Sequence, residues 1–289
     1  MKYYIPLLLV LMFSSTSSAL DFGRLGGTFT MNGEIINGDT VNLLIELSKW
    51  EVPPTVFHIT SPGGDIDEAM LIGEIIRESQ IPVWSGDECS SACVFILASG
   101  VERSVLGKLG LHRPYFDKSY FASLTSTQAK DKYEELKEAS IDYLKKMEVK
   151  QSIIERIFET DSTNIELLEK DEANKLFGYQ SPFYEEWLTA KCGKFTPEQT
   201  KIIKSYWSLV AALQTYQAMN DPSIPKTEDF GSNLDELMEN GKLAYELEKV
   251  NLLQPYIELS QNHKKCTKNA VNTHVYSWHK ELKKILTTE

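Results

Sequence analysis

Three short segments of the chain carry the groups that acyl transfer requires. Residues 61–64 read Ser-Pro-Gly-Gly, residues 89–93 place two serines between two cysteines, and residues 111–113 contain His112. Hydrolysis through an acyl intermediate needs an activated hydroxyl, a proton acceptor and main-chain N–H donors for the developing oxyanion. The order of the three segments therefore predicts an oxyanion turn, a serine nucleophile and a histidine base.

The elements that must position these segments predict an α/β core. Between residues 28 and 112, short β-rich runs alternate with helical patterns, as expected of βαβ units. A first helix is predicted to end before Pro53, and Asp67 is the predicted N-cap of the second. The almost wholly apolar run 94–98 predicts a buried helix with Ser91 at its N-terminus, where the helix dipole favours negative charge. The predicted strands are 28–31, 55–60 and 81–84.

The rest of the chain is predicted to be helical and to contain a domain boundary. Residues 126–177 show a charged helical pattern, and Thr196-Pro197-Glu198-Gln199 has the hydroxyl cap and early proline of a helix start. The composition shifts near residue 190. These patterns predict an α/β domain over residues 20–190 and a domain of three or four helices over residues 191–289.

The N-terminus has the pattern of a secretory signal peptide over residues 1–19. Lys2 precedes an apolar run, and small residues lead to Ala19, after which cleavage is expected. The apolar run is shorter than the roughly 20 residues that span a bilayer, and no later stretch is longer. The mature chain is therefore expected to be exported, periplasmic and without a membrane span. An uncleaved anchor is the alternative.

The charge of the chain argues against nucleic acid as a partner. Without Lys2, the mature chain carries 29 Lys and Arg against 41 Asp and Glu, a net charge of −12. Affinity for nucleic acid depends on clustered Lys and Arg that release counterions. The basic doublets of this chain lie among carboxylates or on predicted helices, so we expect no such cluster.

Export makes the four cysteines candidates for disulfides. Four cysteines allow three pairings, and the sequence does not choose among them. We favour Cys89 with Cys93, because these flank Ser91, and Cys192 with Cys266, which bracket the C-terminal third. The alternative for the first pair is two buried thiols, since a four-residue spacing on a helix only just suits disulfide geometry.

Residues 26–178 resemble the Clp protease proteolytic subunit, in the ClpP/crotonase superfamily, and more closely its exported bacterial relatives. The motifs that carry the resemblance are Ile59-Thr60-Ser61-Pro62-Gly63-Gly64, Cys89-Ser90-Ser91-Ala92-Cys93 and Leu111-His112-Arg113-Pro114. The resemblance implies a fold built as a spiral of ββα units. In this chain an all-α C-terminal domain, which the resemblance does not cover, would follow.

The resemblance also implies roles for individual residues. Ser91 would be the nucleophile, His112 the general base, and the N–H groups of Gly64 and Ala92 the oxyanion hole. Ser90 is the competing nucleophile, but the Cys-x-Ser-Ala-Cys frame of the exported relatives places that role at Ser91. The resemblance implies no cofactor, and it leaves open whether copies of the chain form a homo-oligomer.

This chain departs from the family at the third member of the triad. The family has an aspartate just after a Gly-x-x turn, whereas residues 178–181 read Gly-Tyr-Gln-Ser. Losing the acid of a full triad can lower kcat by about 10⁴-fold. Three alternatives follow: a Ser–His dyad, an acid supplied from elsewhere such as Asp161, or a site without catalysis. Asp161 lies beside Ser162 and Thr163, and a loop aspartate there usually caps a local turn.

Together these patterns predict an exported, ATP-independent serine peptidase that acts on peptide or protein substrates. No phosphate-binding Gly-x-x-x-x-Gly-Lys motif occurs in the chain. The main alternative is a non-catalytic module that binds a peptide or partner in the same cleft, and an acyl-CoA enzyme of the crotonase type ranks last. No metal site is expected, because His263 and Cys266 have no second ligand pair at zinc spacing.

Overall fold

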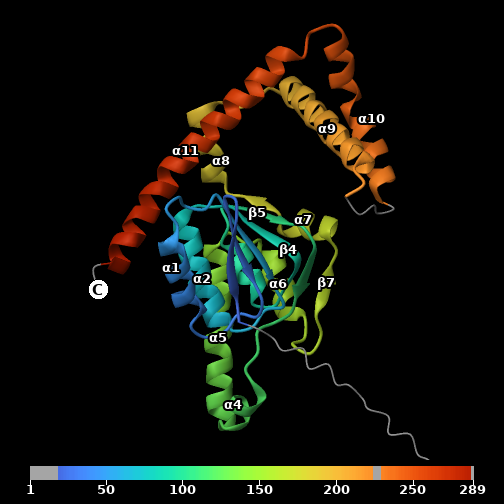
Figure 1. The fold of residues 1–289 in the computed structure, drawn as a ribbon. Coiled ribbons are helices and arrows are strands. Elements are labelled where there is room, and N and C mark those ends of the chain that lie inside the picture. Colours follow the sequence, from blue (N-terminus) through green and yellow to red (C-terminus); the bar gives the residue numbers. More distant parts are fainter. Residues whose placement is uncertain (1–18, 224–228, 288–289) are drawn as a thin grey trace, which may run out of the picture. The chain divides into compact units, whose positions relative to one another are not determined.

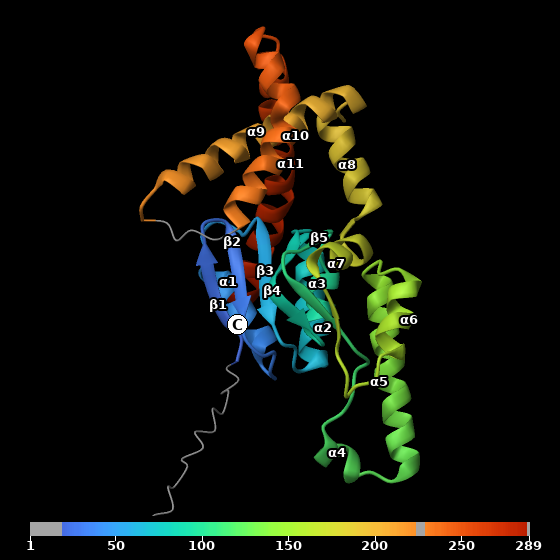
Figure 2. The ribbon, with the colours of Figure 1, turned by 90° about the vertical axis from the view of Figure 1, so that its right-hand side faces the viewer.

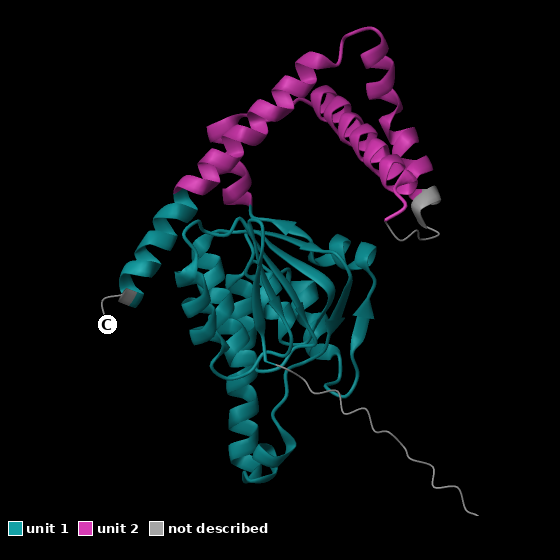
Figure 3. Ribbon diagram, viewed as in Figure 1, with its two compact units in different colours: residues 1–181, 274–289 teal, residues 182–273 magenta. Residues whose placement is uncertain are grey.

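The computed structural model describes residues 19–223 and 229–287 (Figure 1). The predicted signal peptide therefore lies outside the described residues, apart from Ala19. The chain forms two compact units, residues 1–181 with 274–289 and residues 182–273 (Figure 3). This division differs from the predicted one in two places, because residues 182–190 belong to the second unit and the C-terminal residues belong to the first.

The first unit is an α/β fold with a mixed eight-stranded sheet, which confirms the predicted class. The strand order is β1-β2-β3-β4-β5-β8, and β6 pairs with β4 and with β7. Strands β2, β3 and β4 are parallel, while β1 pairs antiparallel with β2. The strands are β1 Asp21–Leu25, β2 Thr28–Asn32, β3 Val56–Ser61, β4 Val83–Ser90, β5 Glu102–Val105, β6 Lys108–Leu111, β7 Glu166–Leu168 and β8 Tyr179–Gln180.

Helices between the strands bury apolar faces against this sheet. On β3, alternate side chains including Phe57 and Ile59 are buried, and the ring of Phe29 on β2 lies 5.6 Å from that of Phe57. Figure 2 shows α4 and α5 projecting together beyond one end of the sheet. The helices are α1 Asp39–Lys49, α2 Ile66–Ser79, α3 Cys93–Ala98, α4 Lys118–Ala122, α5 Ser126–Lys146, α6 Gln151–Glu159 and α7 Lys170–Phe177.

Three local predictions need correction. The N-cap of α2 is Asp65, whose carboxylate accepts from the N–H of Glu68, so the prediction of Asp67 was wrong by two residues. Strand β4 runs to Ser90 rather than ending near residue 84, because its second half pairs with β6. The predicted helical stretch over 126–177 is interrupted by β7, which pairs antiparallel with β6.

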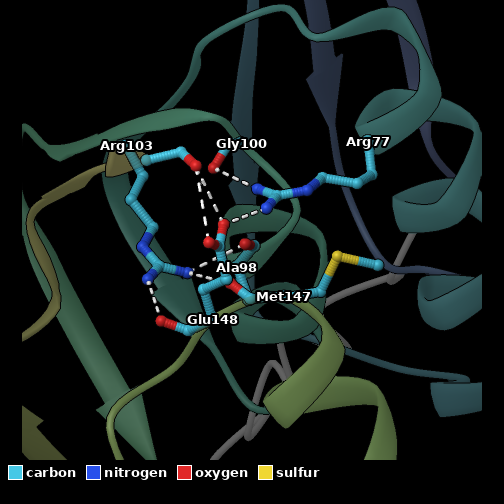
Figure 4. Close-up of polar contacts among 7 residues, drawn as sticks. Arg77, Ala98, Gly100, Arg103, Met147 and Glu148 are labelled. Carbon is cyan, nitrogen blue, oxygen red and sulfur yellow. Dashed lines mark hydrogen bonds and ion pairs between the residues drawn. The ribbon is translucent and has the colours of Figure 1, made fainter. Parts of the chain in front are cut away.

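Arg77 and Arg103 form polar contacts with residues at the C-terminal ends of α3 and α5 (Figure 4). The buried Arg103 donates to the main-chain oxygens of Ala98, Met147 and Glu148 at 2.8 to 3.2 Å. Arg77 forms an ion pair with the Glu148 carboxylate. Burial disfavours the charged form of Glu148, but the contacts with Arg77 hold its pKa below the usual range. The ends of α3 and α5 are therefore fixed by charged donors.

The second unit is helical, as predicted for the C-terminal region. Thr196 is the N-cap of helix α9, and its side chain forms a capping box with Gln199. Helices α9 and α10 pack around Ile202 and Ala244. The helices that lie wholly or partly in this unit are α8 Pro182–Cys192, α9 Pro197–Asn220, α10 Asp229–Lys249 and α11 Gln254–Thr287. Among the described helices, none is both long and apolar enough for a membrane span.

Candidate active site

One cleft of the first unit collects the residues of the three sequence motifs. Its volume is about 780 Å³, and its lining comes from residues 34–37, 62–67, 91, 92, 95, 112 and 114–117, with two further side chains. Ser91, Ala92, Gly64 and His112 all belong to this lining. Asp161 does not. The structure thus brings together four of the five residues that the sequence analysis assigned to catalysis.

Ser91 lies in a tight turn between a strand and a helix. Strand β4 ends at Ser90, and α3 begins at Cys93. Ser91 has a φ of +57°, a left-handed conformation that residues other than glycine adopt rarely and at a cost. A disulfide joins Cys89 to Cys93 across this turn, as predicted. The N–H of Ser91 donates to Gly110 O on β6 at 3.0 Å. The disulfide and this hydrogen bond therefore both restrain the turn.

The neighbouring Ser90 faces away from the cleft. Its side chain is buried, and its Oγ donates to Glu88 Oε1 at 3.1 Å. On the other side it lies against Gly110, where an added Cβ would approach Ser90 Oγ to 2.3 Å. Because only Ser91 lines the cleft, the local geometry favours Ser91 over Ser90 as a nucleophile.

The glycine turn contacts the Ser91 turn directly. A Cβ on Gly63 would lie 2.5 Å from Ser91 Cβ, and one on Gly64 would lie 2.0 Å from Ile35 O. Both glycines also have positive φ, at +110° and +137°. Ser61 Oγ accepts from Gly63 N–H at 3.0 Å and closes the turn. Only residues without a side chain fit this approach, which explains the Gly-Gly pair physically.

Two main-chain N–H groups at the cleft are free to bind an anion. Ile35 forms a parallel bridge with Gly64 through Gly63 O and the N–H of Asp65, so the N–H of Gly64 itself points away from Ile35. The N–H of Ala92 precedes the first turn of α3. Neither group has an acceptor among the described residues. Two such donors beside a serine are the arrangement that an oxyanion hole requires.

His112 follows β6 and is buried, at 7 % exposure. Its Nδ1 lies 2.9 Å from the main-chain oxygen of Arg113. A carbonyl oxygen only accepts hydrogen bonds, so Nδ1 carries a proton in this contact, and in the neutral ring Nε2 is then the acceptor. A neutral histidine with a bare Nε2 is the form that removes a proton from a serine hydroxyl.

Asp161 contacts Arg113 rather than His112. Its Oδ2 accepts from Arg113 Nη2 at 3.1 Å, and its Oδ1 accepts from the N–H and hydroxyl of Thr163. The Thr163 hydrogen bonds, with a smaller contribution from Arg113, hold the pKa of Asp161 below its usual range. These contacts are those of an aspartate that caps a local turn, which was the alternative interpretation of Asp161 from the sequence. Within the described residues, no hydrogen bond joins Asp161 to His112.

Residues 178–181, where the resemblance would place an orienting aspartate, have structural contacts instead. Ser181 donates through its N–H to Val101 O at 2.7 Å and through its hydroxyl to Glu148 at 3.1 Å. The ring of Tyr179 lies against Arg103, with 4.3 Å between the guanidinium carbon and the ring centroid. Residues 178–181 are absent from the cleft lining. The described residues therefore place no carboxylate on His112.

The cleft is acidic, which the sequence analysis missed. Its lining includes Glu34, Asp65, Asp67 and Asp117, and no lysine or arginine among the described residues. Burial raises the pKa of Asp67, and the nearby carboxylates, Asp65 first among them, raise it further. The four acids come from three separate segments, so only the pair beside the glycine turn was visible as a local pattern.

Two other histidines, His263 and His279, have structural contacts. His263 Nε2 lies 3.1 Å from Gly193 O, and His279 Nε2 lies 2.9 Å from Leu47 O. Cys266 forms a disulfide with Cys192, as predicted. In the described part of the chain, no three His, Cys, Asp or Glu side chains are grouped to hold a metal ion.

The cleft thus presents a serine hydroxyl in a strained turn, a histidine with a bare Nε2 and two free N–H donors. These groups come from three segments that are distant in sequence. The interpretation of the cleft depends on this geometry and on the motif order. No family model matches the chain, and no curated protein matches it.

Proposed function

We propose that the protein is an exported serine hydrolase, with peptides as substrates, that uses Ser91 as nucleophile and His112 as general base. One observation carries the proposal: a single cleft gathers Ser91, His112 and the free N–H groups of Gly64 and Ala92. The strained backbone of Ser91 supports it, because such conformations concentrate at functional sites.

The reaction follows from the positions of these groups. Ser91 Oγ attacks the substrate carbonyl carbon while His112 Nε2 takes the hydroxyl proton, and the oxyanion is bound by Gly64 N–H and Ala92 N–H. The intermediate collapses when the carbon–nitrogen bond breaks and His112 gives its proton to the leaving amine. Water then attacks the acyl ester with His112 again as base, which releases the acid and restores Ser91.

The strand order, the N-terminal sequence pattern and the disulfides support this proposal. The parallel order of β2, β3 and β4 and the following α3 fit a ClpP/crotonase-like core, in which the motifs would keep the order of the Clp family. The signal-like N-terminus and the two disulfides fit export to the periplasm. The absence of a phosphate-binding motif from the sequence fits hydrolysis without ATP.

Labelling with a fluorophosphonate probe tests the proposal. The wild type is expected to form one covalent adduct on Ser91, since the probe loses fluoride and phosphonylates only activated serines. Ser91→Ala should abolish labelling, whereas Ser90→Ala, the matched control one residue away, should keep most of it. Tryptic mass spectrometry locates the adduct. An adduct on Ser90, or equal labelling of the heat-denatured protein, would transfer or remove the assigned role.

The acidic lining predicts a preference for basic peptides. Four carboxylates around the cleft attract a cationic side chain and repel an anionic one, so kcat/KM should be about tenfold or more higher for Lys- or Arg-containing peptides than for matched Glu peptides at low salt. The ratio should fall as salt rises, because salt screens exposed charges. Asp67→Asn together with Asp117→Asn should also reduce it. A salt-independent ratio would argue against charge selection.

A non-catalytic binding module is the second candidate, and one contact favours it. His112 Nδ1 faces a carbonyl rather than a carboxylate, which removes the charge that stabilises an imidazolium in a full triad. This candidate predicts tight binding of a peptide without labelling or turnover. The same fluorophosphonate experiment therefore separates the two functions.

A further inference from the structure

We propose that the main-chain carbonyl of Arg113 orients His112 in place of the missing acid, and that Pro114 and Asp161 are positioning residues for this carbonyl. The inference rests on the proposed function of the cleft. It reassigns Asp161, which would act on the histidine through Arg113 and not by direct contact. It also gives a role to the Arg113-Pro114 dipeptide, which lies in the histidine motif.

The hydrogen bond between His112 and the Arg113 carbonyl supplies one of the two effects of a triad acid, the orientation of the imidazole ring. With 2.9 Å between Nδ1 and the carbonyl oxygen, the proton is held on Nδ1 and Nε2 is left bare. The ring orientation is fixed by the same bond. A carbonyl carries a dipole and no net charge, so it stabilises the imidazolium less than a carboxylate would. Orientation is thus retained, while charge compensation is reduced.

The direction of this carbonyl is restricted by the next residue. The oxygen belongs to the peptide bond between Arg113 and Pro114. The Cδ atom of a proline clashes with a helical residue before it, which confines that residue to extended conformations. Pro114 therefore narrows the range of ψ at Arg113, and ψ sets where the Arg113 oxygen points. Because Pro114 has no N–H, it also adds no competing donor at this position.

Two further contacts hold the rest of Arg113. Its N–H donates to Thr160 O at 3.0 Å, and its guanidinium donates to Asp161 Oδ2 at 3.1 Å. Asp161 is itself held by Thr163, whose N–H and hydroxyl both donate to Oδ1. Main chain and side chain of Arg113 are thus attached to the same short segment.

That segment is anchored to β6, the strand that immediately precedes His112. Strand β7 follows it and pairs with β6, with Leu111 opposite Glu166. Arg156 on α6 binds the Glu166 carboxylate through two nitrogens. A continuous set of contacts therefore connects α6, β7 and the Asp161 turn to the carbonyl behind His112, and each contact lies outside the cleft lining.

The first test reads the tautomer of His112 and does not need activity. In full-length Ser91→Ala protein labelled with ¹⁵N-histidine, two-bond ¹H–¹⁵N spectra at alkaline pH should show His112 with the proton on Nδ1, assigned by comparison with a His112→Gln sample. A proton on Nε2 would overturn the proposal. Because the spectrum is independent of turnover, an inactive wild type would refute the proposed function without deciding this inference.

The second test separates the positioning residues from structural ones. Asp161→Asn and Pro114→Ala should each lower kcat by about three- to tenfold, leave KM nearly unchanged and add the Nε2–H tautomer to the spectrum. Arg113→Lys, which keeps a cation beside Asp161, should retain more kcat than Arg113→Ala. Glu169→Gln is the matched control, since it removes only a surface ion pair with Lys108, which lies on β6, the strand before His112.

Two results would contradict this assignment. A loss of about 10⁴-fold in Asp161→Asn would mean that Asp161 acts on His112 directly, as in a full triad. An unchanged kcat and an unchanged tautomer in both Asp161→Asn and Pro114→Ala would mean that neither residue positions the carbonyl. Equal circular dichroism spectra and melting temperatures of the variants confirm that the comparison concerns folded protein.

Discussion

Replacing His112 with alanine is expected to lower kcat by about 10²- to 10⁴-fold, with little change in KM. In the proposed mechanism the imidazole acts only when the Ser91 proton moves, so its loss should raise the barrier to reaction more than it weakens substrate binding. The remaining cleft, with Ser91 and the N–H groups of Gly64 and Ala92, still binds the substrate carbonyl. Steady-state kinetics on a chromogenic peptide ester measure both constants.

A matched control uses a histidine from the other unit. His263 also contacts a main-chain carbonyl, that of Gly193, but it does not line the cleft. His263→Ala should keep wild-type kcat. Added imidazole should restore part of the activity of His112→Ala, because the cleft has room for a small base. A His112→Ala enzyme with wild-type kcat would remove this residue from the mechanism.

The parts of the site that the sequence predicted are those encoded by local backbone requirements. The Gly63-Gly64 pair is needed where no Cβ fits, and the small residues around Ser91 are needed where a strand turns sharply into a buried helix. Such requirements restrict residue type at fixed positions. The order of the motifs was therefore enough to predict that Gly64, Ser91, Ala92 and His112 lie in one cleft.

The proposed orienting group, the Arg113 carbonyl, could not be found in this way. Every residue has a carbonyl, so the sequence carries no mark that selects the one at Arg113. The sequence suggested Asp161 as one possible acid, because side chains are visible in a sequence and main-chain acceptors are not. The one available signal was Pro114, which restricts the residue before it.

The other incorrect predictions of local structure also have physical causes. Asp65 and Asp67 are both good N-caps, and only the contact with the Glu68 N–H distinguishes them. Strand β7 has three residues, too few to show an alternating pattern, and its existence depends on pairing with β6. The second half of β4 contains Gly86, Asp87 and Glu88, which are poor strand formers, and tertiary pairing overrides that preference.

The largest expected effect on stability belongs to Arg103. Its side chain is 5 % exposed, and its guanidinium is the partner of Ala98 O, Met147 O and Glu148 O. Ala98 ends α3 and Met147 is the C-cap of α5, so these oxygens are helix-end acceptors that have no helical partner. Burial lowers the pKa of Arg103 to about 10, which leaves the side chain charged at neutral pH.

Arg103→Met, which keeps the length of the side chain but not its donors, is expected to lower the free energy of unfolding by about 3 kcal/mol. A buried acceptor without a partner costs about 1 to 3 kcal/mol, and water that enters the site would recover part of the loss at three acceptors. Urea unfolding followed by tryptophan fluorescence measures the change.

The matched control for this change is Arg24→Met. Arg24 also lies over an aromatic ring, that of Trp50, and donates to a main-chain oxygen, but this contact is exposed. Its replacement should change the free energy of unfolding by less than about 1 kcal/mol, because water replaces the lost donor. Equal effects of the two variants would show that burial of the three acceptors is not what makes Arg103 important. An intermediate effect of Arg103→Lys is expected, since an ammonium keeps the charge but cannot reach all three oxygens at once.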